Sequence, residues 1–147
     1  MKIQKLLQGI SLVETNVDMD TQVSAVYYDS RQVTPGSLFV AVSGFAADGN
    51  RFIPMALEKG AVAVVTTRKP EGEIPYILVE NDRLALAMLG VNFYGAPARS
   101  MTMIGITGTN GKTSTTLLLK HVLEQTRQAK VGLVGTMFNL IGQEEIP

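Results

Sequence analysis

The 147 residues contain no cysteine and no tryptophan, and His121 is the single histidine. Without cysteine the chain cannot form a disulfide framework, a thiolate metal site or a cysteine redox centre, and this composition is typical of a cytoplasmic protein. A metal site built from several histidines is excluded as well. His121 lies near Lys120 and Glu124 on the polar side of a predicted helix, so we expect a solvated surface histidine.

The chain also lacks an excess of charge, because 13 lysines and arginines balance 13 aspartates and glutamates. A basic field that would attract nucleic acid or an anionic membrane is therefore absent. No apolar run approaches the roughly 18 residues of a membrane-spanning helix, and the N-terminal stretch has no cleavage signal of a secreted protein. We expect a soluble cytoplasmic monomer that binds neither nucleic acid nor membranes.

The first two thirds of the chain alternate between predicted helices and strands. Hydrophobic spacing, turn residues and capping residues predict helices over residues 1–8 and 52–60, and strands over residues 23–28, 37–42, 61–66 and 75–79. A third helix is predicted to begin at Asn81 or Asp82 as its cap and to end near Gly95. The cluster Gly95-Ala96-Pro97 is the sharpest punctuation that follows. We therefore expect a small α/β domain with a mixed sheet over residues 1–98.

The remaining residues, 99–147, predict the beginning of a second domain. Residues 101–106 are typical of a buried strand, 107–111 of a loop, 112–127 of a long helix and 131–134 of another buried strand. This order predicts a right-handed βαβ unit, the first part of a parallel sheet. Since a lone unit of this kind leaves sheet edges unpaired, we expect the domain to be incomplete, that is, truncated.

The loop before the long helix has the composition of a phosphate-binding loop. It reads Gly108, Thr109, Asn110, Gly111, Lys112, Thr113 and Ser114. Backbone N–H groups at a helix start can surround a triphosphate, the lysine adds a cation, and the Thr113 hydroxyl can bind Mg²⁺. The alternative is a tight strand-to-helix turn, but a lysine in the first turn opposes the helix dipole unless an anion binds there. The sequence therefore predicts binding of ATP and Mg²⁺.

The wider pattern of such loops begins with a glycine where this chain has Ile106, and this departure is informative. The string from Ile106 to Ser114 resembles the ATP site of the Mur ligases, which also lack that glycine. The N-terminal part resembles the tripeptide synthetases of the family (MurE type) through Asp29-Ser30-Arg31, the run from Pro35 to Ala41, and Gly44, Asp48-Gly49 and Gly60-Ala61. Residues 132–136 also match, so the resemblance covers essentially the whole chain.

The resemblance implies an ATP-dependent amide ligase of peptidoglycan synthesis. Such enzymes join meso-diaminopimelate or L-lysine to UDP-N-acetylmuramoyl-L-alanyl-D-glutamate through an acyl phosphate. It implies that residues 1–98 hold the UDP end of this substrate and that residues 99–147 begin the central ATP-binding domain. The substrate-binding residues would be Tyr28, Ser30, Phe45, Ala46 and Ala47, and Lys112 would be the catalytic residue.

Some of these residues also have simpler interpretations. Taken alone, Asp29-Ser30-Arg31 is typical of a strand end with a solvated charge pair, and Asp48-Gly49 of a helix cap and turn. In the family, the carbamylated lysine, a second metal-binding carboxylate and the amino-acid pocket lie beyond the position of Pro147. We therefore expect this chain to be an N-terminal fragment that is inactive by itself.

Three other functions remain open at this point. A Mur ligase that adds D-alanyl-D-alanine has a similar N-terminal domain, although its loop usually lacks the Thr-Asn pair. Folylpolyglutamate synthetase shares Gly-Thr-Asn-Gly-Lys but normally has no long domain before it. A non-catalytic nucleotide-binding module could carry the same loop, and saturable binding of a UDP-muramoyl peptide would distinguish the ligase from it.

Overall fold

A computed structural model describes residues 1–44 and 48–146, and the chain separates into two compact units. Unit 1 comprises Met1–Met101 and unit 2 comprises Thr102–Pro147. The elements of unit 1 are, in chain order, α1 (Ile3–Leu6), β1 (Leu12–Thr15), β2 (Val26–Tyr27), β3 (Leu38–Val40), the 3-10 helix η1 (Gly49–Phe52), α2 (Ile53–Glu58), β4 (Ala63–Thr66), β5 (Tyr76–Val79), α3 (Asp82–Tyr94) and the 3-10 helix η2 (Pro97–Ser100).

Unit 1 is built on a five-stranded mixed sheet with the order β1-β5-β4-β3-β2. The strands β2, β3, β4 and β5 are parallel, and β1 joins β5 in the antiparallel direction. The mixed sheet predicted for this part is therefore present. Strand β1 was not predicted, because its side chains are largely exposed and its sequence lacks a clear alternation.

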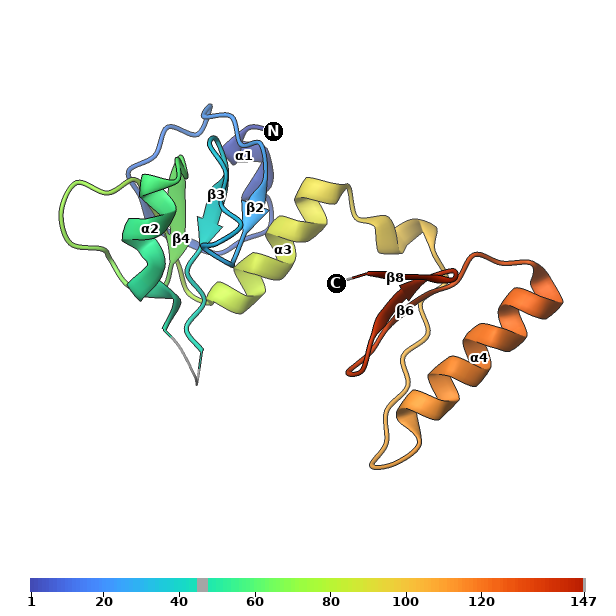
Figure 1. The fold of residues 1–147 in the computed structure, drawn as a ribbon. Coiled ribbons are helices and arrows are strands. Elements are labelled where there is room, and N and C mark those ends of the chain that lie inside the picture. Colours follow the sequence, from blue (N-terminus) through green and yellow to red (C-terminus); the bar gives the residue numbers. More distant parts are fainter. Residues whose placement is uncertain (45–47, 147) are drawn as a thin grey trace. The chain divides into compact units, whose positions relative to one another are not determined.

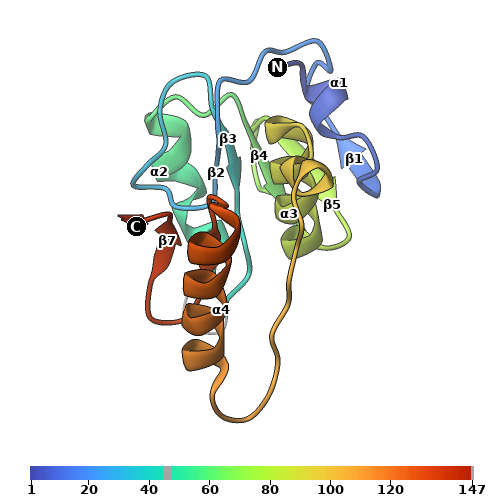
Figure 2. The same ribbon diagram turned by 90° about the vertical axis from the view of Figure 1, so that its right-hand side faces the viewer.

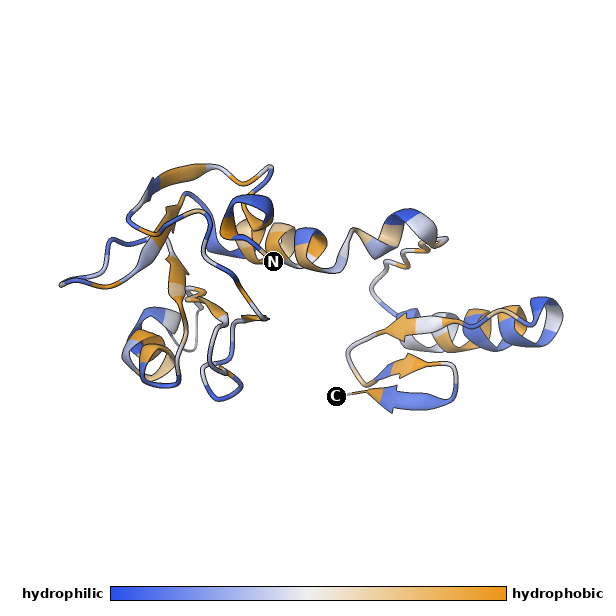
Figure 3. Cartoon of the chain, turned by 90° about the horizontal axis from the view of Figure 1, so that it is seen from above, coloured by the Kyte–Doolittle hydropathy of each residue, from blue (hydrophilic) through white to orange (hydrophobic). Residues whose placement is uncertain are grey.

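Helices cover both faces of this sheet, with α2 on one face and α3 on the other (Figure 1; Figure 2). Alternate residues of each strand point to opposite faces. Leu38 and Val40 of β3 pack in a core with α1 and α3, whereas Phe39 packs in a second core with Ile53 and Ala56 of α2. The strands of unit 1 are largely hydrophobic in Figure 3, as expected for strands covered on both faces.

The local sequence explains where helix α3 begins and ends. Asn81 caps its first turn, because its Oδ1 accepts a hydrogen bond from the N–H of Leu84 at 2.9 Å. Gly95 closes it in the left-handed conformation, with a φ of 74°. The helix predicted here is confirmed, and of its two possible caps, Asn81 and Asp82, the structure has Asn81.

Unit 2 contains α4 (Lys112–Arg127) and a three-stranded antiparallel sheet of β6 (Gly132–Val134), β7 (Asn139–Ile141) and β8 (Glu144–Ile146). The predicted helix is confirmed. The predicted βαβ unit is not formed, because residues 102–108 form no strand and β6 pairs with β7 in the antiparallel direction.

This difference has a physical reason. A strand needs a neighbour for its backbone hydrogen bonds, and a hairpin such as β6–β7 closes only a short loop. In unit 2, β6 takes its backbone hydrogen bonds from β7, its neighbour in the chain. Met101, Met103 and Ile104, which were expected to be buried in that strand, are more than half exposed.

Among the described residues, no helix is long and apolar enough to cross a membrane. The longest helix, α4, has 16 residues and carries several polar side chains.

Candidate functional site

Tyr28 and Ser30, two of the residues predicted to bind the UDP end, lie at the end of the sheet of unit 1 where the parallel strands finish. Tyr28 and Ser30 directly follow β2, and Ser43 and Gly44 follow β3. Because β2 and β3 are parallel neighbours, their carboxyl ends meet at the same edge. Open α/β sheets commonly bind ligands at this edge. Phe45, Ala46 and Ala47 lie outside the described residues.

Ser30 and Tyr28 differ sharply in exposure. Ser30 is 6% exposed, and its Oγ donates a hydrogen bond to the sulfur of Met55 on α2, at 3.4 Å. The Tyr28 side chain is 68% exposed and therefore offers a large aromatic surface to solvent. A buried hydroxyl and an exposed aromatic residue that lie two residues apart in the chain could serve a planar ligand with polar edges.

The two charged neighbours of Ser30 form an exposed ion pair. Arg31 donates to both carboxylate oxygens of Asp29, with the shortest distance, 2.7 Å, from Nη2 to Oδ2. The Arg31 side chain and then its backbone N–H lower the pKa of Asp29 to about 2. The solvated charge pair considered for Asp29 and Arg31 is therefore confirmed, while Ser30 between them is buried.

A hydrogen-bond network fixes the chain where it returns from the loop after β3. The Asp48 carboxylate accepts from the N–H and the side-chain amide of Asn50, at 3.1 and 2.7 Å, and from Arg68 at 3.0 Å. Thr66, at the end of β4 and fully buried, donates to Oδ1 of Asn50 at 2.7 Å. The two bonds from Asn50, followed by the charge of Arg68, lower the pKa of Asp48. The predicted helix cap at Asp48 is thus confirmed.

The chain after β3 is also held at Ser43, by a carboxylate that the sequence indicated only as a possible helix cap. Asp82 is 6% exposed, and its Oδ2 accepts from the N–H of Ser43 at 2.8 Å. The Ser43 Oγ is buried and has no hydrogen-bond partner among the described residues. Asp82 follows the capping residue Asn81, so the sequence could predict its position at a helix start. It could not predict the hydrogen bond to Ser43, which lies 39 residues away.

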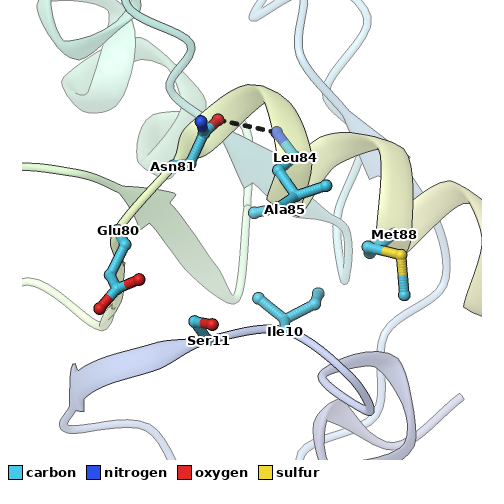
Figure 4. A pocket seen from close by; sticks show the side chains of 7 residues that line it. All are labelled: Ile10, Ser11, Glu80, Asn81, Leu84, Ala85 and Met88. Carbon is cyan, nitrogen blue, oxygen red and sulfur yellow. Dashed lines mark hydrogen bonds between the residues drawn. The ribbon is translucent and has the colours of Figure 1, made fainter.

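A small cavity lies at the carboxyl end of β5, where Glu80 and Asn81 follow the strand (Figure 4). In the strand order, β5 is separated from β2 by β4 and β3. Its volume is about 40 Å³, and it is lined by Ile10, Ser11, Glu80, Asn81, Leu84, Ala85 and Met88. Pockets for small-molecule ligands usually have volumes of about 300 Å³ or more, so this cavity is too small for a nucleotide.

The predicted phosphate loop precedes α4 in unit 2. Gly108 has a φ of 150° and Gly111 a φ of 76°, conformations that side chains disfavour. Helix α4 begins at Lys112, and its N-cap residue is Gly111, which has no side chain to cap the first turn. The Lys112 ammonium donates to the carbonyl oxygens of Gly108 and Thr109, at 2.6 and 3.4 Å. The glycines, the lysine and Thr113 therefore lie together at one helix start, where uncapped N–H groups favour an anion.

The polar side of α4 is partly buried, contrary to what its sequence predicted. Lys120 is 7% exposed and pairs with Glu124 at 2.8 Å, and Glu124 also accepts from Gln143 at 3.2 Å. His121 is exposed, as predicted. No group of three or more histidine, aspartate or glutamate side chains that could hold a metal ion occurs among the described residues.

Family models match both parts of the chain. The "Mur ligase family, catalytic domain" matches residues 22–94, and the "Mur ligase middle domain" matches residues 106–146. The chain belongs to the Mur ligase family. The two matched regions include Tyr28 and Ser30 in the first and the whole phosphate loop in the second.

Individual Mur ligases show the extent of the similarity. The UDP-N-acetylmuramoyl-L-alanyl-D-glutamate--2,6-diaminopimelate ligase of Alkaliphilus metalliredigens is 43% identical over 99% of this chain. A solved structure of a ligase with the same name has a TM-score of 0.75 over the whole chain at 23% identity, which supports the fold. The MurF ligase of Thermotoga maritima, solved with ADP, has a TM-score of 0.54 and 33% identity over 72% of the chain. The chain spans 30%, 30% and 24% of the lengths of these three proteins.

Proposed function

We propose that the chain is part of a cytoplasmic Mur ligase that adds 2,6-diaminopimelate to UDP-N-acetylmuramoyl-L-alanyl-D-glutamate in peptidoglycan synthesis. The observation that carries the proposal is the 43% identity, over nearly the whole chain, to a ligase named for this reaction. Because the chain spans only 30% of that ligase, the proposal for the whole enzyme includes parts outside these residues. Binding of the UDP end is the step that this chain can test.

In this proposal unit 1 binds the UDP end at the carboxyl edge of β2 and β3. Ser30 supplies a buried hydroxyl that can hydrogen-bond to the nucleotide, and Tyr28, two residues earlier in the chain, supplies an exposed aromatic residue. Phe45, Ala46 and Ala47 remain predicted contacts from the neighbouring loop. The hydrogen bonds of Asp82 and Asp48 hold the described ends of that loop, which supports a binding role for this edge.

Unit 2 would hold the phosphates of ATP at the start of α4. The fit rests on the two glycines with positive φ, the uncapped first turn, and Lys112, whose ammonium now contacts loop carbonyls. We propose that Lys112 turns from these carbonyls to the outer phosphates and that the Thr113 hydroxyl binds the Mg²⁺. Gly108, Thr109, Asn110, Gly111 and Ser114 would contribute backbone and hydroxyl groups around the phosphates.

The test is isothermal calorimetry of the 147-residue chain with UDP-N-acetylmuramoyl-L-alanyl-D-glutamate. We expect saturable binding, and we expect Ser30→Ala to weaken it about threefold to thirtyfold, because the nucleotide loses its hydrogen bond to the buried hydroxyl. Ser11→Ala is the matched control, since Ser11 lines the small cavity at the other end of the edge. Equal affinities of the unchanged chain and Ser30→Ala would contradict the assignment of Ser30.

The D-alanyl-D-alanine-adding ligase remains a second candidate, because a MurF ligase is 33% identical over part of the chain. The higher identity over nearly the whole chain favours the diaminopimelate ligase. In the whole enzyme, ATP hydrolysis that depends on diaminopimelate would support the first function. Hydrolysis that depends on L-lysine or on D-alanyl-D-alanine would contradict it.

A further inference from the structure

The hydroxyl of Ser30 is buried, but its hydrogen-bond partner is a weak acceptor. It donates to the Met55 sulfur at 3.4 Å, and this is its one hydrogen bond to the described residues. A thioether is a weak acceptor, whereas a serine hydroxyl also has two lone pairs that can accept hydrogen bonds. While the proton points to Met55, Ser30 Oγ is left as an acceptor for a ligand N–H group.

Met55 contacts Ser30 and is also open to solvent. The Met55 side chain is 41% exposed, although its sulfur lies at hydrogen-bond distance from a buried oxygen. Phe52, three residues earlier on the same helical segment, is 40% exposed. Apolar residues of η1 and α2 are therefore exposed, of which Met55 contacts Ser30, and Tyr28 is exposed two residues before Ser30 in the chain.

We propose that Met55 is a specificity-determining residue of the UDP site, because it orients the Ser30 hydroxyl and contacts the pyrimidine base. This inference rests on the proposed function. With the proton held by sulfur, Ser30 Oγ accepts a hydrogen bond from the ring N–H of uracil. Cytosine has an unprotonated nitrogen at that ring position and gains no such bond. The exposed thioether packs against the base, a contact that sulfur makes favourably with aromatic rings.

The test compares Met55→Leu with the unchanged 147-residue chain. Leucine has a similar volume and suits a helix, but it lacks the sulfur acceptor. Calorimetry with UDP-N-acetylmuramoyl-L-alanyl-D-glutamate measures affinity, and displacement by UDP or CDP measures base preference. We expect Met55→Leu to weaken the binding of the UDP substrate and of UDP about threefold to tenfold, and to weaken the binding of CDP less, because cytosine shares the contact with sulfur but has no hydrogen bond to Ser30 to lose.

Met88→Leu is the matched control, because Met88 is a partly buried methionine that lines the small cavity and has no hydrogen bond to Ser30 among the described residues. It should leave both affinities unchanged, and thermal unfolding should show that all variants are folded. A double-mutant cycle with Ser30→Ala adds a readout that a merely structural role would not change. Because Met55 acts through Ser30, most of the loss in Met55→Leu should disappear in the Ser30→Ala background.

The outcomes separate this inference from the proposed function. If the UDP substrate binds and Ser30→Ala weakens it, but Met55→Leu changes neither affinity nor base preference, the role of Met55 is wrong and the UDP site stands. If Met55→Leu weakens binding equally in the unchanged chain and in the Ser30→Ala variant, the orienting role of Met55 is also wrong. If the unchanged chain binds no UDP substrate, the proposed function itself fails.

Discussion

At the scale of single residues, two aspartates near the sheet edge are each paired with an arginine but are held by different groups. Arg31 is the main cause of the lowered pKa of Asp29. The lowered pKa of Asp48 comes first from Asn50, and Arg68 contributes less. Both main partners, Arg31 and Asn50, lie two residues after their aspartate, but the attraction of an exposed ion pair is screened by salt, whereas a hydrogen bond from a neutral amide is not. Asp48 is therefore held mainly by the amide and the backbone N–H of Asn50, and Asp29 mainly by the exposed guanidinium of Arg31 together with the backbone N–H of Arg31.

We expect the carboxyl group of Asp29 to titrate near pH 2 in the folded chain, below its ordinary pKa of 3.8. Since the folded pKa is lowered, the ionised form stabilises the fold above about pH 4, and this contribution is lost as the pH falls towards 2. Carboxyl chemical shifts in an NMR titration measure the midpoint. Arg31→Ala should return it towards 3.8, and an unchanged midpoint would contradict the assigned cause.

Gly49 is required by close backbone packing. A Cβ atom at this position would lie 2.6 Å from the carbonyl oxygen and 2.7 Å from the nitrogen of Val42. We expect Gly49→Ala to lower the free energy of unfolding by about 1–3 kcal/mol, because backbone has to move. Urea denaturation measures this change.

Gly90→Ala is the control for Gly49→Ala, since a Cβ there meets nothing within 4 Å and Gly90 lies inside α3. It should stabilise the chain by up to about 1 kcal/mol through helix propensity. If Gly49→Ala were equally harmless, the close packing of residue 49 on Val42 would be wrong.

At the scale of elements, the loop after β3 is held by side chains from α3 and β4. Asp82 on α3 accepts from Ser43, and Thr66 on β4 donates to Asn50. The sequence predicted these strands and the helix, because each has a local pattern. It did not predict the bonds between them, because the partners are separated by 39 and 16 residues and carry no local signal.

We expect Asp82→Ala to destabilise unit 1 by about 1–3 kcal/mol, because it leaves the Ser43 N–H without its partner. It should also weaken binding of the UDP substrate, since Ser43 begins the loop beside the proposed site. Urea denaturation and calorimetry measure the two effects. Asp20→Ala is the control, because Asp20 forms an exposed ion pair with Lys2. Equal stabilities of the two variants would contradict the role of Asp82.

At the scale of the whole molecule, the two units differ in how much they bury. Two hydrophobic cores cover both faces of the sheet in unit 1, and all their buried residues belong to that unit. In the described part of unit 2, Lys120 and Leu133 are the buried residues. Small domains are marginally stable even with a good core.

Residues 1–101 expressed alone should therefore unfold cooperatively and bind the UDP substrate with the affinity of the 147-residue chain. Residues 102–147 expressed alone should show no cooperative transition. Thermal unfolding followed by circular dichroism, together with calorimetry, measures these properties. A non-cooperative 1–101 segment, or one that loses the affinity of the chain, would show that unit 1 is not self-sufficient.

The sequence by itself determined the alternation of helices and strands in residues 1–98, the helix after the phosphate loop, and the Mur ligase resemblance that the family models confirm. These features are local, because caps, glycines and hydrophobic spacing lie within a few residues of one another. The functional assignments of 1–98 and 99–147, and of the phosphate loop, stay predictions.

Only the tertiary structure decided the antiparallel place of β1, the absence of a strand over residues 102–108, and the contact between Ser30 and Met55. An apolar run shows that a segment can be a strand, but it does not show which neighbour pairs with it. A buried hydroxyl likewise takes its partner from whichever element packs over it. For Ser30 that element is α2, and the partner is the sulfur of Met55.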